Sequence, residues 1–403
     1  MSSHFTPERI IGPDVTASVA DVLARHIGTG KWVLVCDDTT WVAAGEAVYT
    51  RLGGHSCVTP HSLGRAARPL LSHTTPLMDA NCDGFIAVGS GTINDVTKLT
   101  AARLNKPYIS IATAASMNGY TSANASLEEQ GAKHSYAASP PRAVIADLTV
   151  LAAAPRRMAR AGLGDTLCRN SVEPDMLMSH LLLDTPYPRA LFDRMRAHEA
   201  DLIANAAALR EGNPTLIHKL MEALLDAGDA MREFGSSAPA SQGEHMIAHT
   251  AEMLYGGELR KVLHGEMIAV TSSTMSHLQQ KMLLAQPTVK PLPKDEGQFL
   301  RLFGKQAGQD AVAMYQKKLL TPDMAASINA RIAPNWLDIK AALLAVMLPS
   351  NAVERAFIQS GNATRPTEIG MSDDRYRTAC TYAFMTRDRF TFLDLAVMND
   401  KRI

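Results

Sequence analysis

Short apolar runs rich in β-branched residues recur through the first 150 residues, and helical patterns separate them. The runs are KWVLVCDD (31–38), GFIAVGSG (84–91), PYISIATA (107–114) and RAVIADLT (142–149). A helical pattern, TINDVTKLTAARL (92–104), follows the second run. Because parallel neighbours need a long crossover connection, strands that alternate with helices indicate a parallel sheet covered by helices. We therefore predict an α/β fold with a doubly wound parallel sheet here.

The sequence loses this alternation after about residue 155, where Ala, Leu, Met, Glu and Arg dominate with helical spacing. Two stretches, 188–211 and 213–235, carry a proline near the first turn, as helices often do. A chain of 403 residues is also too long for one compact core. We therefore predict two domains, an α/β domain at residues 1–154 and an all-helical domain at residues 155–403.

Charge and cysteine content exclude several classes of protein. The chain carries 40 Lys plus Arg and 40 Asp plus Glu, so its formal charge of zero gives no attraction to nucleic acid or to an anionic membrane. Its five cysteines are scattered without a C-x-x-C pair, which argues against a disulfide framework or a zinc knuckle. The N-terminus lacks a secretory pattern, and the apolar run at 341–348 is too short to span a membrane. We expect a cytoplasmic protein with no nucleic-acid partner and no membrane insertion.

The segment FIAVGSGTINDVTK (85–98) predicts a strand, a turn at GSG (89–91) and then a helix. Glycines let backbone amides approach a ligand, and the start of a helix offers N–H groups that suit phosphate. Thr92 would add a hydroxyl. The pattern is G-x-G-x-x-N, with Asn94 where a dinucleotide fingerprint has its third glycine. The turn therefore fits either a phosphate site or an ordinary connection between strand and helix.

Two other turns follow predicted strands. Asp37, at the end of the first strand, can hold a ribose hydroxyl pair and would repel a 2′-phosphate, which favours NAD over NADP. An aspartate there also fits a solvated strand end or a helix N-cap. The segment ATAASMNGYTSANASL (112–127) follows the third strand and is rich in small and hydroxyl residues. Such residues permit the close approach of a flat ring or a phosphate, and they equally suit a plain turn.

Three of the chain's 13 histidines lie in SQGEHMIAHTAEMLYGGELRKVLHGEM (241–267). His245 and His249 are four residues apart, which places them on one face of a helix, and His264 follows the glycine pair that ends it. Imidazole nitrogens together with a carboxylate are typical ligands of a divalent metal. The candidate carboxylate is Asp165, which we place in the first turn of a helix after two glycines. The same histidine spacing also suits an ordinary surface or core pair.

The ordered motifs GSGTINDVTK, TAASMNGYTS, AGLGD, EHMIAH and HGEM resemble the iron-containing alcohol dehydrogenase and dehydroquinate synthase superfamily, and within it the bacterial glycerol-1-phosphate dehydrogenases. The segment RDRFTFLDLA (387–396) resembles that family's C-terminal signature, so the likeness runs from about residue 30 to 396. It implies a nucleotide-binding domain, a helical domain, NAD or NADP, and one divalent metal. The implied reaction is the interconversion of sn-glycerol-1-phosphate and dihydroxyacetone phosphate by hydride transfer to or from the nicotinamide. We also expect a homo-oligomer, a dimer.

Residue roles follow from the resemblance, motif by motif. The implied metal ligands are Asp165, His245 and His264, and the implied substrate contacts are Asn118, Asp165 and His249, with Asp165 and His249 as the catalytic residues. The implied cofactor-binding residues are Asp37, Gly89, Ser90, Gly91, Thr92, Ile93, Thr113, Ser116 and Ser122. Zinc suits the ligand set, and so do nickel and ferrous iron. Arg169, Arg260 and Lys261 fit either the substrate phosphate or solvated helix faces.

The chain departs from the family at Asn118. The family typically reads S-M-D-G where this chain has SMNG (116–119), so the side chain keeps its shape, loses its charge and gains a donor. This change leaves the exact substrate open. Two alternative functions are a dehydroquinate synthase-like lyase and a non-catalytic nucleotide-binding protein. Asp165 and the C-terminal signature speak against the lyase, and the intact set of metal-ligand residues speaks against the non-catalytic protein.

Overall fold

The computed structural model describes residues 5–28, 30–53, 58–64, 68–129, 132–293 and 296–401, and it divides the chain into two compact units. Unit 1 comprises residues 1–166 and 195–236, and unit 2 comprises residues 167–194 and 237–403. The chain therefore passes from unit 1 into unit 2 twice. This grouping reflects compactness, and the functional boundary expected at residues 154–155 stays a prediction.

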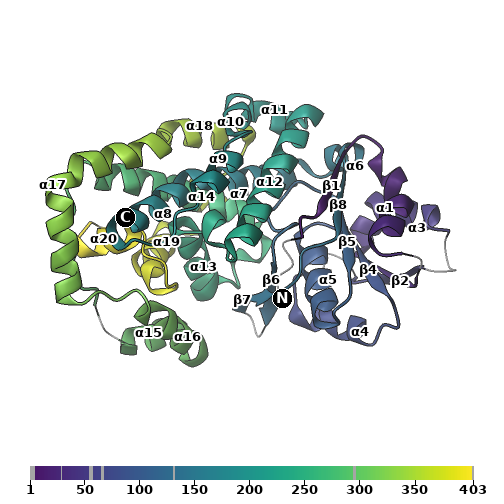
Figure 1. Ribbon diagram of the computed structural model, residues 1–403, viewed down its shortest axis with the longest axis horizontal. Coiled ribbons are helices and arrows are strands. Elements are labelled where there is room, and N and C mark those ends of the chain that lie inside the picture. Colours follow the sequence, from purple (N-terminus) through teal and green to yellow (C-terminus); the bar gives the residue numbers. More distant parts are fainter. Residues whose placement is uncertain are drawn as a thin grey trace. The chain divides into compact units, whose positions relative to one another are not determined.

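Unit 1 is built on a six-stranded sheet in which every pair of neighbours is parallel. The strands are β1 (Glu8–Gly12), β2 (Trp32–Cys36), β3 (Val58–Ser62), β4 (Gly84–Gly89), β5 (Tyr108–Ala112) and β8 (Ala143–Asp147). Their order is β1-β8-β5-β4-β2-β3 (Figure 1). The four predicted strands are confirmed as β2, β4, β5 and β8. The strands β1 and β3 were not predicted, since both are edge strands with few buried residues, and β3 contains Pro60, a residue typical of edges.

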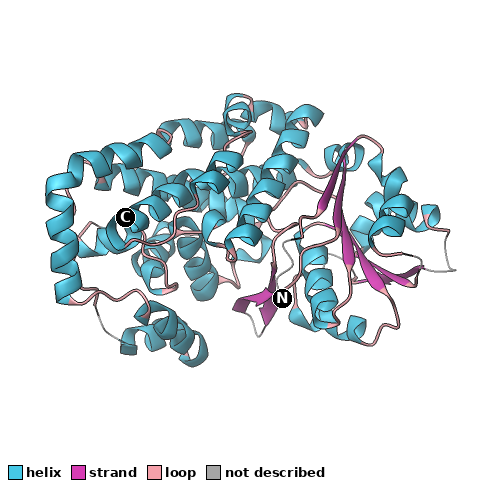
Figure 2. Ribbon diagram, viewed as in Figure 1, coloured by secondary structure: helices cyan, strands magenta, loops and turns pink. Residues whose placement is uncertain are grey.

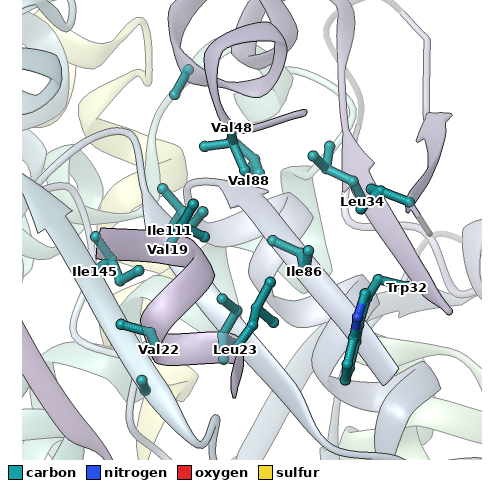
Figure 3. Close-up of a cluster of buried hydrophobic side chains, with 14 of the residues drawn as sticks. Val19, Val22, Leu23, Trp32, Leu34, Val48, Ile86, Val88, Ile111 and Ile145 are labelled. Carbon is teal, nitrogen blue, oxygen red and sulfur yellow. The ribbon is translucent and has the colours of Figure 1, made fainter. Parts of the chain in front are cut away.

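Helices cover both faces of this sheet. Along β2, Trp32 and Leu34 lie in one apolar core with α1 (Val19–His26) and α3 (Glu46–Arg51). Figure 3 shows Trp32 and Leu34 together with Val19, Val22 and Leu23 of α1 as members of this core. Val33 and Val35 lie in a second core with α4 (Thr75–Met78) and α5 (Gly91–Arg103). Successive side chains of a strand point to opposite faces, so burial of both faces explains why the strands read as continuous apolar runs.

The rest of unit 1 contains a hairpin, β6 (Asn124–Glu129) with β7 (Ala132–Ala137), and several helices. The helices are α6 (Leu148–Ala153), α7 (Arg156–Leu167), α10 (Glu199–Ala204), α11 (Ala206–Glu211) and α12 (Pro214–Phe234). The predicted helix at 213–235 is confirmed as α12, whose N-cap Asn213 accepts the Leu216 amide at 3.2 Å. Arg9 of β1 joins α12 to the sheet through Asp226 at 2.7 Å and Asp229 at 2.5 Å.

The single helix predicted at 188–211 is wrong. The structure divides this stretch into α9 (Arg189–Met195), α10 and α11. Asn205 ends α10 with a φ of −117° and a ψ of 22°, and its side-chain amide donates to the Asp201 carbonyl at 3.0 Å. An asparagine that bonds to nearby backbone competes with helix continuation, which local apolar spacing does not reveal.

The described residues of unit 2 form helices and no strand, as the predicted helical domain requires (Figure 2). Besides α9, its helices are α8 (Arg169–Leu183), α13 (Gly243–Tyr255), α14 (His264–Met282), α15 (Glu296–Phe303), α16 (Lys305–Gln316), α17 (Pro322–Val346), α18 (Ser350–Ser360), α19 (Asp373–Tyr382) and α20 (Phe392–Met398). The buried carboxylate of Asp175 in α8 accepts the amides of Gly243 at 3.0 Å and Phe392 at 2.9 Å. It thereby ties the starts of α13 and α20 to α8.

One segment, Pro322–Ser360, passes a length-and-composition test for a membrane-spanning helix. It comprises α17 and α18, which a non-helical stretch around Pro349 separates. Core helices of proteins that never meet a membrane pass the same test, so a single match is weak support for a span. Leu337 and Leu344 of α17 are nonetheless 79% and 47% exposed, so α17 presents apolar side chains on its surface.

Candidate active site

The predicted glycine turn connects a central strand of unit 1 with the helix that follows it. β4 ends at Gly89 and α5 begins at Gly91, with Ser90 as an extended N-cap residue (φ −104°, ψ −150°). Within the described residues, the Ser90 side chain makes no capping hydrogen bond to this 13-residue helix. The first amides of a helix attract anions. The turn thus presents backbone donors that suit a pyrophosphate.

The two glycines of this turn differ in what surrounds them. A Cβ at Gly89 would lie 2.5 Å from the Cβ of Ile93, so the packing of the turn itself requires glycine there. A Cβ at Gly91 would meet Met117 Cγ at 3.5 Å, which is ordinary contact, and no other described atom within 4 Å. Packing therefore does not require glycine at position 91, and close approach of a ligand is a sufficient reason for it.

Asn94, at the position of the missing third glycine, is fully buried. Its Oδ1 accepts a hydrogen bond from Ser110 Oγ at 3.1 Å, and its Nδ2 donates to Asp95 Oδ1 at 3.0 Å. Asp95 also accepts the backbone amide of Ser126 at 2.9 Å. The asparagine thus ties α5 to β5 and, through Asp95, to β6. Its structural role explains why the turn departs from the glycine fingerprint.

Asp37 lies at the carboxyl end of β2, beside β4. It is the N-cap of α2 (Asp38–Thr40), where its Oδ1 accepts the Thr40 amide at 2.7 Å and its own amide donates to Thr40 Oγ1 at 2.9 Å. The N-cap interpretation that the sequence left open is therefore present in the structure. Because carboxyl ends of parallel strands share one edge, Asp37 lies on the same edge as the glycine turn. Its contact with a ribose stays a prediction.

A buried lysine holds the loop that follows β5. Lys98 of α5 is 0% exposed and donates to the Gly119 carbonyl at 2.5 Å, the Asn124 carbonyl at 3.1 Å and the Ser122 hydroxyl at 3.1 Å. Burial lowers the pKa of the Lys98 ammonium from 10.5 to about 8, against the attraction of Asp95. Lys98 lies in the glycine-turn motif, whose pattern predicted no role for it.

The residues expected to line the nicotinamide lie on this loop. The Thr113 amide donates to the Gly89 carbonyl at 3.2 Å, which joins the loop to the glycine turn. The Ser122 hydroxyl lies 3.0 Å from the carbonyl oxygens of Gly119 and Asn124 and so serves the loop's own structure. Ser116 is half-buried on the same loop. The structure therefore gathers these residues in unit 1, while their contact with a cofactor stays a prediction.

Two helices of unit 1 approach the loop closely at glycines. A Cβ at Gly162 of α7 would lie 2.1 Å from the Ala115 carbonyl oxygen. A Cβ at Gly228 of α12 would lie 2.4 Å from Thr121 Oγ1 and 2.7 Å from the Asn118 carbonyl oxygen. Backbone atoms cannot yield to such overlaps, so only glycine fits at both positions. These glycines allow α7 and α12 to seat the loop.

The predicted position of Asp165 in the first turn of a helix is wrong. Asp165 lies near the C-terminal end of α7, two residues before Leu167. The glycines before it lie inside the helix, and Gly162 is there because of its contact with the loop. The carboxylate is 2% exposed, and its Oδ2 accepts the backbone amide of Asn118 at 2.8 Å. Asp165 is thus fixed against the loop of unit 1.

The three histidines of the sequence cluster lie together in unit 2. His245 and His249 are on α13, and His264 is the first residue of α14. The ring centroids of His245 and His264 are 5.1 Å apart, and His249 lies 6.0 Å from each of them. The Nε2 atoms of His245 and His264 are 3.2 Å apart. Two ring nitrogens that face one another at this distance can share a proton or a metal ion.

Carboxylates face the opposite side of these rings. Glu244 Oε1 lies 2.8 Å from His245 Nδ1. Glu252 Oε2 lies 3.1 Å from His249 Nδ1, and its Oε1 lies 3.9 Å from His264 Nδ1. The two shorter contacts favour protons on the Nδ1 atoms of His245 and His249 and leave their Nε2 atoms for the centre of the cluster. Neither glutamate was predicted as a site residue, although Glu244 is adjacent to His245.

The basic residues near the ligand motifs differ in their surroundings. Arg169 is buried and bonds to the buried Glu173. Arg260 and Lys261 are exposed in a short turn between α13 and α14. The solvated interpretation therefore does not describe Arg169, and contact of Arg169, Arg260 or Lys261 with a substrate phosphate stays a prediction.

Comparison with known proteins identifies the family. The family model of iron-containing alcohol dehydrogenase matches residues 10–155. A glycerol-1-phosphate dehydrogenase (NAD(P)+) of Thermococcus kodakarensis is 34% identical over 274 residues, which cover 67% of this chain and 77% of that protein. Its counterpart from Geobacillus thermodenitrificans is 31% identical over 329 residues, with 77% and 80% covered. The chain belongs to the glycerol-1-phosphate dehydrogenase family.

Solved structures agree with this family at the level of the fold. A probable glycerol dehydrogenase from Sinorhizobium meliloti has a TM-score of 0.65 and 16% identity, and the match covers 100% of this chain and 97% of that one. The fold is therefore that of the iron-containing alcohol dehydrogenases. Family membership makes this protein an NAD(P)-dependent, metal-containing alcohol dehydrogenase and sets aside the lyase and the non-catalytic alternative.

Proposed function

We propose that this protein catalyses the reversible NAD(P)-linked oxidation of sn-glycerol-1-phosphate to dihydroxyacetone phosphate. The observation that supports the proposal most directly is the histidine cluster, whose ring nitrogens face one another in a chain related to glycerol-1-phosphate dehydrogenases. The dehydrogenase class follows from the family. The substrate is proposed from the names of the relatives.

The histidine cluster has the donor set of a divalent metal site. The Nε2 atoms of His245 and His264 are 3.2 Å apart. Two ring nitrogens on one tetrahedral zinc lie about 3.3 Å apart, since each Zn–N bond is about 2.0–2.1 Å. We propose zinc, with nickel and ferrous iron as alternatives. When bound, the metal would polarise the substrate oxygen as a Lewis acid and ease the loss of its proton.

Asp165 is proposed as the third, carboxylate ligand. The support is continuity of the chain. Three residues after Asp165, Cys168 keeps a helical backbone (φ −58°, ψ −23°), and residues three apart on a helical path share one face. The ligand atoms of Cys168, Glu244 and His245 lie within 4.8 Å of one another. A carboxylate would also offset one unit of the metal's charge.

We propose that the dinucleotide binds at the carboxyl edge of the sheet. The pyrophosphate would lie on the amides of Gly89, Ser90, Gly91, Thr92 and Ile93. The adenosine ribose would contact Asp37, and this carboxylate favours NAD over NADP. Thr113, Ser116 and Ser122 would line the nicotinamide, which supplies or accepts the hydride. The close approach permitted at Gly91 supports this placement.

Asn118 and His249 are proposed to contact the substrate. His249 would accept the proton of the substrate hydroxyl, directly or through water. Glu252, 3.1 Å from His249 Nδ1, would stabilise the imidazolium that results. The Asn118 amide offers both a donor and an acceptor to a substrate hydroxyl. Asn118 is neutral where the family has a charged aspartate. We therefore propose that it determines which polyol phosphate the enzyme accepts.

A homodimer and a cytoplasmic location are also proposed. The exposed apolar residues Leu337 and Leu344 of α17 support self-association, because a second copy would remove them from water. Sedimentation at several protein concentrations tests the dimer. A monomer at all of them would contradict it.

The proposed function is tested by NADH and NADPH oxidation with the purified protein of known metal content. Dihydroxyacetone phosphate is compared with dihydroxyacetone and glyceraldehyde. We expect turnover with the phosphate ester, little with the other two, and loss of activity after treatment with a chelator. Turnover that does not need the phosphate would contradict the substrate. If the metal-loaded protein is inactive on all three compounds, glycerol-1-phosphate is excluded as the substrate. Asn118 would then guide the search for another ketone.

A further inference from the structure

We propose that Glu244 is a positioning residue that fixes the tautomer of His245 and thereby sets the affinity of the metal site. The inference deepens the proposed function and rests on its assignment of His245 as a metal ligand. Glu244 itself would not touch the metal or the substrate. It would act through the imidazole ring beside it.

The contact between Glu244 and His245 is short and buried. Glu244 Oε1 lies 2.8 Å from His245 Nδ1, and the two residues are 0% and 5% exposed. Adjacent side chains on a helix ordinarily point in different directions. The bond is therefore not a by-product of helical spacing, and it needs a specific side-chain conformation at the first turn of α13. A negative charge is favoured at that end of a helix.

Other groups hold the glutamate in place. Glu244 Oε1 also accepts a hydrogen bond from the backbone N–H of Gln242 at 2.8 Å, and Glu244 Oε2 lies 3.0 Å from Ser171 Oγ of α8. Both carboxyl oxygens of Glu244 are therefore engaged as hydrogen-bond acceptors.

This arrangement decides which nitrogen of His245 carries the proton. A carboxylate accepts hydrogen bonds and donates none, so Nδ1 of His245 must carry the proton that it shares with Glu244. In the neutral ring, Nε2 then keeps its lone pair, and this is the nitrogen that lies 3.2 Å from His264 Nε2. A hydrogen bond from a ligating histidine to a carboxylate also makes the ligating nitrogen more basic.

A different role for Glu244 is geometrically available, since Cys168, Glu244 and His245 could together hold a metal ion. The hydrogen bonds disfavour this role. The Glu244 oxygens receive bonds from Gln242, Ser171 and His245, and Cys168 Sγ lies 3.8 Å from the Ala240 carbonyl. A metal at Glu244 would displace several of these bonds, whereas a metal at Nε2 of His245 would displace none of them.

The test uses Glu244→Gln, which keeps the size of the side chain and removes its charge. The variant can remain folded because Ser171 Oγ also lies 3.0 Å from the Cys168 carbonyl. The serine can donate there and accept from the new amide. The matched control is Glu173→Gln in α8, the same substitution at a carboxylate that is also 0% exposed and bonds to Arg169 and Tyr187.

Two measurements are made on the full-length proteins. Zinc affinity is measured by competition with a chromophoric chelator, and we expect Glu244→Gln to weaken it about 10- to 100-fold, with the control within about two-fold. The tautomers of the metal-free proteins are read from the ¹⁵N NMR signals of labelled histidines, with His245→Asn to assign His245. We expect the Nδ1–H form of His245 in the wild type, in the control and in Glu244→Gln, whose amide oxygen still accepts from Nδ1, and a mixture of forms in Glu244→Leu, which offers no acceptor.

Each outcome decides the proposal. Unchanged zinc affinity in Glu244→Gln, or an unchanged His245 tautomer in Glu244→Leu, would overturn it, and so would an equal loss of affinity in Glu173→Gln. If the wild type binds no zinc, the metal in the proposed function is wrong, and the effect on affinity is wrong with it. The NMR signals of the metal-free protein would still show whether Glu244 fixes the ring.

Discussion

The backbone amide of Asn118 donates to the Asp165 carboxylate at 2.8 Å, whereas the Asn118 side-chain amide lies 3.4 Å from the Asp165 backbone carbonyl. The proposed carboxylate ligand is therefore oriented by a main-chain group, which any residue except proline supplies at position 118. The side chain, where this chain departs from its family, is not needed for that bond. Substrate recognition and metal binding can thus be separated at Asn118.

Replacing Asn118 with Ala should lower kcat/KM for dihydroxyacetone phosphate and leave zinc affinity within about two-fold. A lost hydrogen bond between neutral groups costs roughly 0.5–1.5 kcal/mol, which is about 2- to 10-fold in kcat/KM. Steady-state kinetics measure kcat/KM, and competition with a chelator measures zinc affinity, on the same preparations. A parallel loss of zinc would show that the side chain orients Asp165 after all.

Replacing His264 with Ala should abolish zinc binding and turnover while NADH binding persists. The residues of the glycine turn lie in unit 1, and His264 lies in unit 2, so the loss should be confined to the metal. Metal analysis and a fluorescence titration with NADH provide the measurements. Chelator treatment of the wild type should likewise abolish turnover and leave NADH binding intact. Full activity of a metal-depleted His264→Ala protein would refute the proposed chemistry.

Replacing Gly228 with Ala should destabilise unit 1. The new Cβ would lie 2.4 Å from Thr121 Oγ1 and 2.7 Å from the Asn118 carbonyl oxygen, which is backbone and cannot rotate away. Such overpacking costs about 1–3 kcal/mol of the free energy of unfolding. Urea unfolding followed by tryptophan fluorescence measures it, since Trp32 and Trp41 both lie in unit 1.

The control for this prediction is Gly257→Ala, because a Cβ there would meet no described atom within 4 Å. It should leave the unfolding midpoint nearly unchanged. Equal midpoints for the two variants would mean that the loop yields to α12, and that Gly228 does not seat it.

The contribution of Lys98 to stability should increase with pH above about 8. Burial lowers the pKa of its ammonium from 10.5 to about 8 in the folded protein. Between these two values the unfolded chain binds more protons than the native state, so stability rises with pH. The difference in pKa corresponds to about 3 kcal/mol. Below about pH 8 both states are protonated, and the contribution is constant.

The measurement compares the wild type with Lys98→Met by urea unfolding at several pH values from 7 to 10.5. Other groups titrate in both proteins, so their effects cancel in the difference. The variant should be less stable at every pH, since it leaves three acceptors without their donor, and the difference should widen above pH 8. A difference that is independent of pH would show that Lys98 keeps an ordinary pKa.

Much of the fold could be predicted because it depends on local patterns. The runs at 31–38, 84–91, 107–114 and 142–149 are apolar on both faces, and a strand buried on both faces in a parallel sheet needs that pattern. The spacing of His245 and His249 placed them on one face of α13 for the same reason. The edge strands β1 and β3 were not predicted, because half-exposed strands do not need a continuous apolar run.

Partner choice between distant residues could not be predicted. Asn118 and Asp165 are 47 residues apart, and Asp175 and the Phe392 amide are 217 apart. Nothing in the sequence around Lys98 states that the Gly119 and Asn124 carbonyls would surround its ammonium. The glycines before Asp165 predicted a helix start, whereas they lie inside α7, where Gly162 packs closely against Ala115.

The sequence by itself determined the strand and helix types, the order of the motifs and the identity of the donor residues, because these follow from periodicity and side-chain chemistry. The tertiary structure alone decided which carboxylate faces which histidine and which backbone groups hold the loop. Hydrogen bonds and charges act over a few ångströms, so they take their partners only after apolar burial has packed the helices and strands together.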